Sequence, residues 1–225
     1  MALLDDIPKL EQELRSRADA ERADEMSAYL KDQFELLGVP TPARRAALKK
    51  AIDTRIVPDR DDLKLAVDEL FALPEREFHY CAVDLARRWQ RVLIVDDLPW
   101  LETLITTHSW WDTVDAIATH PVGHVVRADR SSAQPILERW IAADDLWLNR
   151  SAILHQLLYK DETDSEQLFR YCDLHADSKL FFHRKAIGWA LRQYARTDPD
   201  AVRSYVESRR QRLSGLTIRE ALKHL

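Results

Sequence analysis

Residues 76–91 read REFHYCAVDLARRWQR, and this stretch decides the fold class. Its apolar residues recur at intervals of four, three and four, which places them on one face of a helix: Phe78, Ala82, Leu85 and Trp89. The alternation that marks a strand is hard to find in the chain. Comparable helical blocks are expected at about residues 22–37, 42–55, 61–73, 99–107, 110–119, 133–142, 146–159, 164–175, 180–196, 199–211 and 217–224.

Proline and glycine separate these blocks, as in GVPTP at residues 38–42 and HPVG at residues 120–123. About a dozen helices joined by short loops favour stacked antiparallel pairs, with a repeat spacing typical of HEAT-type proteins. We therefore expect an all-α, HEAT-like helical-repeat solenoid that forms a single domain over residues 1–225 and has a concave surface, where an extended partner usually binds. No sharp consensus repeat is present, so a helical bundle stays an alternative.

The composition supports helices. The chain has 225 residues, of which 46% are hydrophobic, so it can bury a core. Only 4 residues are glycine, which leaves few residues suited to the tight turns of β-hairpins. Cys81, Cys172 and the histidines lack metal-ligand spacing, so neither a metal nor a cofactor is expected. No long apolar run and no basic leader are present, which predicts a soluble, cytoplasmic protein with no membrane contact. A monomer is favoured.

The charge distribution matters more than the net charge of −5, which by itself argues mildly against a nucleic-acid partner. Residues 181–225 contain ten Lys or Arg and four Asp or Glu. An acidic chain with a basic C-terminal part can still form a cationic groove.

The segment SWWDTVD at residues 109–115 contains the first anomaly. Ser109 is expected to cap a helix, with Asp112 as the capping-box acid. Asp115 lies one turn after Trp111, so a carboxylate and an indole share a face. Such a pair suits a positive charge supplied by a ligand. From the residues alone, an ion pair with a neighbouring helix is the favoured explanation of Asp115.

Arg150 is the second anomaly, because it heads an apolar stripe that includes Ile153 and Leu157. It either closes a buried ion pair, which the residues alone favour, or projects into a cleft. Trp189 is the third, because it lies within a cationic stripe made of Lys185, Arg192 and Arg196. That pattern fits a phosphate backbone and a flat base or sugar, or an indole covered by the stems of the basic side chains.

Six motifs in order resemble the AlkD family of DNA alkylation-repair glycosylases over nearly the whole chain. They are MSAYLK (26–31), GVPTPARR (38–45), LPEREF (73–78), SWWDTVD (109–115), WLNRSAI (147–153) and KAIGWALR (185–192). Residues 118–124 depart from the family pattern.

The resemblance implies a role for each matching residue. Trp111 and Trp189 would flank the sugar of the lesion, Asp115 would be the catalytic carboxylate, and Arg150 would hold the DNA backbone. Further DNA contacts are expected from Arg192, Lys185, Tyr29, Arg44 and Arg45.

The predicted function is that of a DNA repair glycosylase that excises cationic N3- or N7-alkylated purines from double-stranded DNA by hydrolysis of the N-glycosidic bond. The alternative is a non-catalytic HEAT-repeat protein that recognises damaged or branched DNA, and a third possibility is a scaffold for other proteins. The sequence leaves open whether the base is flipped out of the duplex and which lesion is preferred.

Overall fold

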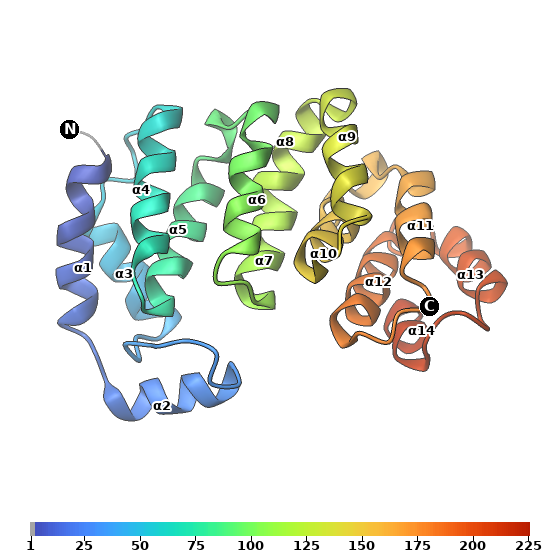
Figure 1. Cartoon of the computed structure of the whole chain (residues 1–225), viewed down its shortest axis with the longest axis horizontal. Helices are drawn as coiled ribbons and strands as arrows, with labels where there is room; N and C mark the ends of the chain where they lie inside the picture. Colours follow the sequence, from blue (N-terminus) through green and yellow to red (C-terminus); the bar gives the residue numbers. More distant parts are fainter. Residues whose placement is uncertain (1–2) are drawn as a thin grey trace. The chain divides into compact units, whose positions relative to one another are not determined.

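The structure is a computed structural model that describes residues 3–225, and these residues form helices and no β-strand (Figure 1). The one strand-like feature is an isolated bridge between Glu35 and Glu75. The predicted all-α helical-repeat class is thereby confirmed. The helices group into two compact units, and the boundary along the chain lies between Leu93 and Ile94. The expectation of a single domain stays a prediction. No helix within residues 3–225 combines the length and apolar character needed to cross a membrane.

The first unit contains seven helical segments. They are η1 (Leu3–Asp6), α1 (Ile7–Arg15), α2 (Ala20–Tyr29), α3 (Thr41–Ala51), α4 (Arg60–Ala72), α5 (Arg76–Arg88) and η2 (Gln90–Val92). α4 packs on α5 and α1 packs on α3, and apolar side chains such as Leu10, Leu70 and Phe78 are fully buried between them. The predicted face of α5 is therefore its core face. The block expected at residues 22–37 ends earlier, because Lys31 and Asp32 turn the chain with φ values of 63° and 56°.

A buried carboxylate organises the loop after α2. Glu77, at the start of α5, accepts hydrogen bonds from the backbone N–H groups of Leu37, Gly38 and Val39 at 3.0, 2.9 and 2.9 Å. Gly38 has a φ of 83°, and a Cβ there would lie 2.0 Å from the carbonyl oxygen of Asp19. Only glycine fits that position. The GVPTP and LPEREF motifs thus have a structural basis in this unit.

The second unit contains the remaining helices. They are η3 (Val95–Asp97), α6 (Leu98–Thr106), α7 (Trp111–Ile117), η4 (Ala118–Val122), α8 (Gly123–Ala128), α9 (Arg130–Ile141), α10 (Leu146–Leu154), η5 (Lys160–Glu162), α11 (Ser165–Leu174), α12 (Phe181–Tyr194), α13 (Pro199–Ser208) and α14 (Gly215–Ala221). α10 packs against α6, α7, α9 and α12, so it is the middle of this unit. A short connection joins α9 to α10, so these two helices are antiparallel, as neighbouring helices are in helical repeats.

The predicted break at residues 120–123 is wrong. α7, η4 and α8 follow one another without interruption from Trp111 to Ala128. Pro121 lies inside η4, which is a π-helical turn. A proline has no N–H and crowds the carbonyl group four residues earlier, and the wider π turn removes both conflicts. This segment coincides with the departure from the family pattern.

Candidate active site

Asp115 on α7 and Arg150 on α10 form a bidentate ion pair. Nε of Arg150 donates to Oδ1 of Asp115 at 2.6 Å, and Nη2 donates to Oδ2 at 2.7 Å. Nη1 donates to the carbonyl oxygen of Phe182, on α12, at 2.8 Å. The side chains of Arg150 and Asp115 are 5% and 14% exposed. The ion pair that the residues alone favoured for both is therefore present, and it joins the two anomalies to each other.

The surroundings of Asp115 favour its uncharged form. Burial raises the pKa of the Asp115 carboxyl above the ordinary value for aspartate, while the hydrogen bonds from Arg150 oppose this shift. The negative charge of Asp112 acts in the same direction as burial. The result is a carboxylate of increased basicity held in a fixed orientation, which can accept a proton or oppose a positive charge.

The start of α7 differs from the predicted capping box. Ser109 donates its hydroxyl to the carbonyl oxygen of Ile105, at the end of α6, at 2.7 Å, and it does not cap α7. Trp110 occupies the N-cap position in an extended conformation, without a side-chain cap hydrogen bond. The prediction failed because the open carbonyl groups at the end of the preceding helix compete for the same hydroxyl. Asp112 instead accepts a hydrogen bond from the N–H of Thr113.

Three aromatic side chains gather where α7, α10 and α12 begin. The ring centroids of Trp110 and Trp147 are 5.8 Å apart, and the ring of Phe182 lies 5.3 Å from Trp110 and 4.9 Å from Trp147. The guanidinium carbon of Arg150 is 5.7 Å from the ring centroid of Phe182. The ring of Phe182 therefore joins this cluster to the guanidinium group of the ion pair. Trp110, Trp147 and Phe182 were not predicted as site residues; an aromatic residue at three helix starts in turn is the signal that could have revealed them.

Trp189 lies on the same face of α12 as Phe182, because seven residues complete nearly two turns. That spacing corresponds to about 10 Å along the helix axis. The indole of Trp189 is half-buried, as is that of Trp111 on α7. α10 packs against both α7 and α12, so the elements that hold the predicted catalytic residues are direct neighbours of the helix that holds Arg150.

The cationic face of α12 is partly neutralised by Glu220 of α14. Nζ of Lys185 lies 3.2 Å from Oε1 of Glu220, and Nη1 of Arg192 lies 2.7 Å from Oε2. Gly188 permits this approach, because a Cβ there would lie 2.6 Å from the Cβ of Glu220. The face is therefore less positive than the sequence of α12 suggests.

Three further predicted DNA contacts lie in the first unit. Tyr29 is 69% exposed at the end of α2. Arg44 pairs with Asp84 at 2.7 Å and its side chain is only 6% exposed, whereas the side chain of Arg45 is 59% exposed. Arg45 is therefore better placed than Arg44 to reach a phosphate.

Within residues 3–225, no group of three or more His, Cys, Asp or Glu side chains could hold a metal ion. Cys81 and Cys172 are buried free thiols, and burial raises the pKa of Cys81 to about 11. Neither thiol is therefore a reactive nucleophile at neutral pH.

The fold and the site define a helical-repeat protein with a basic carboxylate held beside a cluster of aromatic side chains. The family model described as DNA alkylation repair enzyme matches residues 10–225. The chain therefore belongs to the DNA alkylation repair enzyme family, and its role is in DNA repair with DNA as the substrate.

Several solved structures resemble the chain, among them the following two. A predicted DNA alkylation repair enzyme from Enterococcus faecalis is 31% identical, with a TM-score of 0.84 over 92% of this chain and 96% of that one. The protein smu.31 from Streptococcus mutans UA159 is 16% identical, with a TM-score of 0.61 over 94% of this chain and 99% of that one, a likeness of fold alone. No curated protein matches the chain.

Proposed function

We propose that the protein is a DNA glycosylase that excises cationic N3- or N7-alkylated purines from double-stranded DNA, with Asp115 as the catalytic carboxylate. The observation that carries the proposal is the bidentate ion pair between Arg150 and Asp115. The aromatic cluster of Trp110, Trp147 and Phe182 lies next to this pair. A carboxylate that is buried, oriented and raised in pKa is a costly arrangement, and such arrangements concentrate at functional sites.

In the proposed reaction the alkylated base is already a good leaving group, and the enzyme stabilises the charge that develops on the sugar. Alkylation at N3 or N7 makes the purine cationic, so the base leaves as a neutral molecule when the bond between C1′ and nitrogen breaks. Positive charge then develops on the deoxyribose, as in glycoside hydrolysis. Asp115 opposes that charge and orients a water molecule whose oxygen bonds to C1′ and whose proton passes to the carboxylate. The products are the free base and an abasic site.

Trp111 and Trp189 supply the aromatic surfaces of the site. An indole face against a developing cation contributes about 0.5–2 kcal/mol. Both indoles are half-buried, so each is supported by packing and retains an accessible part. We assign both to contact with the sugar of the lesion, as the family resemblance implies.

Arg150 acts first as the positioning residue for Asp115. Three of its nitrogens are engaged by Asp115 and the carbonyl group of Phe182. A guanidinium group has five N–H donors, so two remain, but the side chain is only 5% exposed, which makes Arg150, like Arg44, a weaker candidate for the DNA-backbone contact that the resemblance implies. Arg192, Lys185, Tyr29 and Arg45 complete the proposed backbone contacts, and Arg44 is a weaker candidate because it is buried.

The test is the release of free bases from methylated duplex DNA. We expect release by the wild type and a loss on the order of 10²–10⁴-fold in Asp115→Asn, with DNA binding nearly unchanged. Asp112→Asn is the matched control, because it removes the same charge from a neighbouring carboxylate of α7, which accepts a hydrogen bond from the N–H of Thr113. Equal loss of binding and release in Asp115→Asn would point to a folding role.

A non-catalytic DNA-binding protein is the second candidate, and one observation favours it. Both carboxylate oxygens of Asp115 already accept a hydrogen bond from Arg150, as in a purely structural ion pair. Under this alternative the protein binds alkylated duplexes but releases no base from them.

A further inference from the structure

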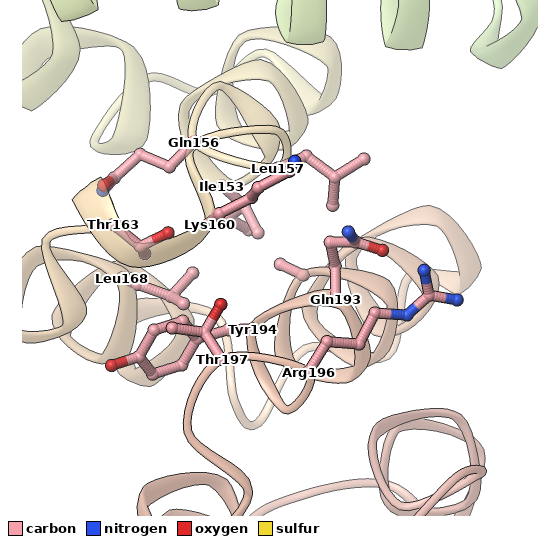
Figure 2. Close-up of a pocket in the computed structure, with 11 residues that line it drawn as sticks. Ile153, Gln156, Leu157, Lys160, Thr163, Leu168, Gln193, Tyr194, Arg196 and Thr197 are labelled. Atoms are coloured by element: carbon pink, nitrogen blue, oxygen red, sulfur yellow. The ribbon is translucent and has the colours of Figure 1, made fainter.

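A pocket of about 200 Å³ lies in the second unit, apart from the Asp115–Arg150 pair (Figure 2). Its walls come from α10 and the segment that follows it, from α11, and from the end of α12. Ile153, Leu157, Leu168 and Ala190 form its apolar part. None of these residues belongs to the proposed catalytic site.

Besides Gln156, which hydrogen-bonds to Gln167 and to the backbone of Asp164, six polar side chains line the same pocket. These six are Lys160, Thr163, Gln193, Tyr194, Arg196 and Thr197. None of them takes part in a side-chain hydrogen bond or ion pair within residues 3–225. In Figure 2 the side chains of Gln193 and Arg196 extend toward the same side of the pocket. The other arginines nearby behave differently, since Arg170, Arg192 and Arg209 all pair with carboxylates. Two cations and four neutral polar groups are therefore available to a ligand.

The chemistry of these groups selects a phosphate. Lysine and arginine side chains offer only donors, and hydroxyl and amide groups can donate as well. A phosphate group offers negative charge and several acceptor oxygens, which match such a set. Lys160 has a φ of 56°, a conformation that non-glycine residues rarely adopt. That strain, at a residue that lines the pocket, is itself typical of binding sites.

The position of the pocket points to the DNA backbone as the source of the phosphate. Arg196 follows Trp189 by seven residues, so both lie on one side of α12 and its continuation, separated by about 10 Å. At this distance the pocket can reach a backbone phosphate within a few nucleotides of a sugar held at Trp189.

We propose that Lys160 and Arg196 bind a DNA backbone phosphate within a few nucleotides of the lesion. Gln193, on the same side of the pocket as Arg196, donates a further hydrogen bond to this phosphate, and the apolar wall accepts the adjoining sugar. The choice of DNA as the ligand, and of the lesion as the reference point, rests on the proposed function.

The first test removes both charges in a Lys160→Gln, Arg196→Gln double variant of the full chain. Affinity for an undamaged duplex is measured at increasing KCl concentration. We expect the magnitude of the slope of log K against log salt to decrease by about one, because both cations neutralise a single phosphate, with binding weakened on the order of tenfold at 0.1 M salt. The control is Arg203→Gln with Arg210→Gln, which removes the same charge from arginines that pair with carboxylates of α13. A double variant that matches this control overturns the proposal.

The second test locates the phosphate. A series of lesion duplexes carries one uncharged methylphosphonate at each position within about five nucleotides of the lesion. One substitution within this range weakens duplex binding by the wild type and has no effect on binding by the double variant. Equal sensitivity of the two proteins at every position overturns the assignment.

The third test separates DNA from a free phosphate. Inorganic phosphate and deoxyadenosine monophosphate are added to the wild type and the double variant, and the thermal unfolding temperature is measured. Protection of the wild type alone, together with equal salt slopes on DNA, overturns the DNA assignment in favour of a free ligand. None of these readouts requires base release, so a chain that shows the salt effect but excises nothing contradicts only the proposed function.

Discussion

The contact between Asp115 and Arg150 joins two charged groups that water would otherwise solvate. Removing each from water costs several kcal/mol, and a two-pronged pair in good geometry offsets most of that cost without a clear net gain. The pair is therefore weak evidence for a stabilising role. A carboxylate in a low-dielectric site stabilises a nearby cation more strongly than an exposed carboxylate does, because the attraction between opposite charges is stronger there than in water.

The pH dependence of excision follows from the raised pKa of Asp115. The carboxylate form is required, so activity falls as the pH decreases through that pKa, and the acid limb lies above the value of about 4 for an ordinary aspartate. Arg150→Gln removes the main influence that lowers the pKa, so its acid limb moves to higher pH. Arg150→Lys keeps the positive charge and limits this movement. The measurement is kcat/KM for base release against pH, and an unmoved limb in Arg150→Gln contradicts the assignment.

The two halves of the ion pair differ in what their loss does to stability. Asp115→Leu leaves a buried guanidinium that cannot lose its proton, so we expect a loss of about 3–5 kcal/mol in the free energy of unfolding. Arg150→Met costs less, because burial allows the Asp115 carboxyl to take up a proton. The double variant recovers stability relative to Asp115→Leu. Urea unfolding of the three variants at pH 7 measures these differences, and simple additivity would argue against a coupled pair.

At the scale of single elements, α10 is buried on every side from Leu148 to Leu154, as the middle helix of its unit. Helix periodicity identified α5 and α12, in which buried apolar residues recur at helical spacing. It failed at Pro121 and Ser109, where a π turn and a neighbouring helix end decide the outcome. Asp115 and Arg150 were each recognisable as unusual, but their pairing was not predicted. Local spacing does not encode which residue of the next helix faces a given side chain.

The contact of α12 with α14 depends on Gly188. Gly188→Ala places a methyl group 2.6 Å from Glu220 and 3.1 Å from the carbonyl oxygen of Thr217, so α14 must shift. We expect a loss of about 1–3 kcal/mol in stability, although alanine favours a helix. Gly215→Ala is the control, because its nearest neighbour is the flexible end of Arg219. Chemical denaturation of both variants distinguishes them, and equal stability would refute the close approach.

At the scale of the whole molecule, stability depends on buried neutral histidines. Burial lowers the pKa of both His155 and His183 to about 4. The unfolded chain binds protons near pH 6.5, so it takes up more protons than the folded chain between about pH 6.5 and 4. Stability is therefore full above pH 6.5 and decreases as the pH falls to 4.

Each of these histidines contributes about 3 kcal/mol to that loss, from a shift of roughly two pH units or more. His155→Gln removes the titrating group, so we expect a flatter dependence of unfolding free energy on pH over this window. Urea unfolding at a series of pH values measures it. A wild type whose stability rises on acidification contradicts the burial of neutral histidines.

The proposed function requires that Asp115 stabilises the deoxyribose of a nucleotide as it loses its cationic base. The most direct measurement is the single-turnover rate of base release from a duplex with one N-alkylated purine, compared for wild type, Asp115→Asn and Asp112→Asn. We predict release by the wild type and Asp112→Asn, and a loss on the order of 10²–10⁴-fold in Asp115→Asn at unchanged duplex affinity. Release by Asp115→Asn at the wild-type rate, or no release by the folded wild type, would contradict the account.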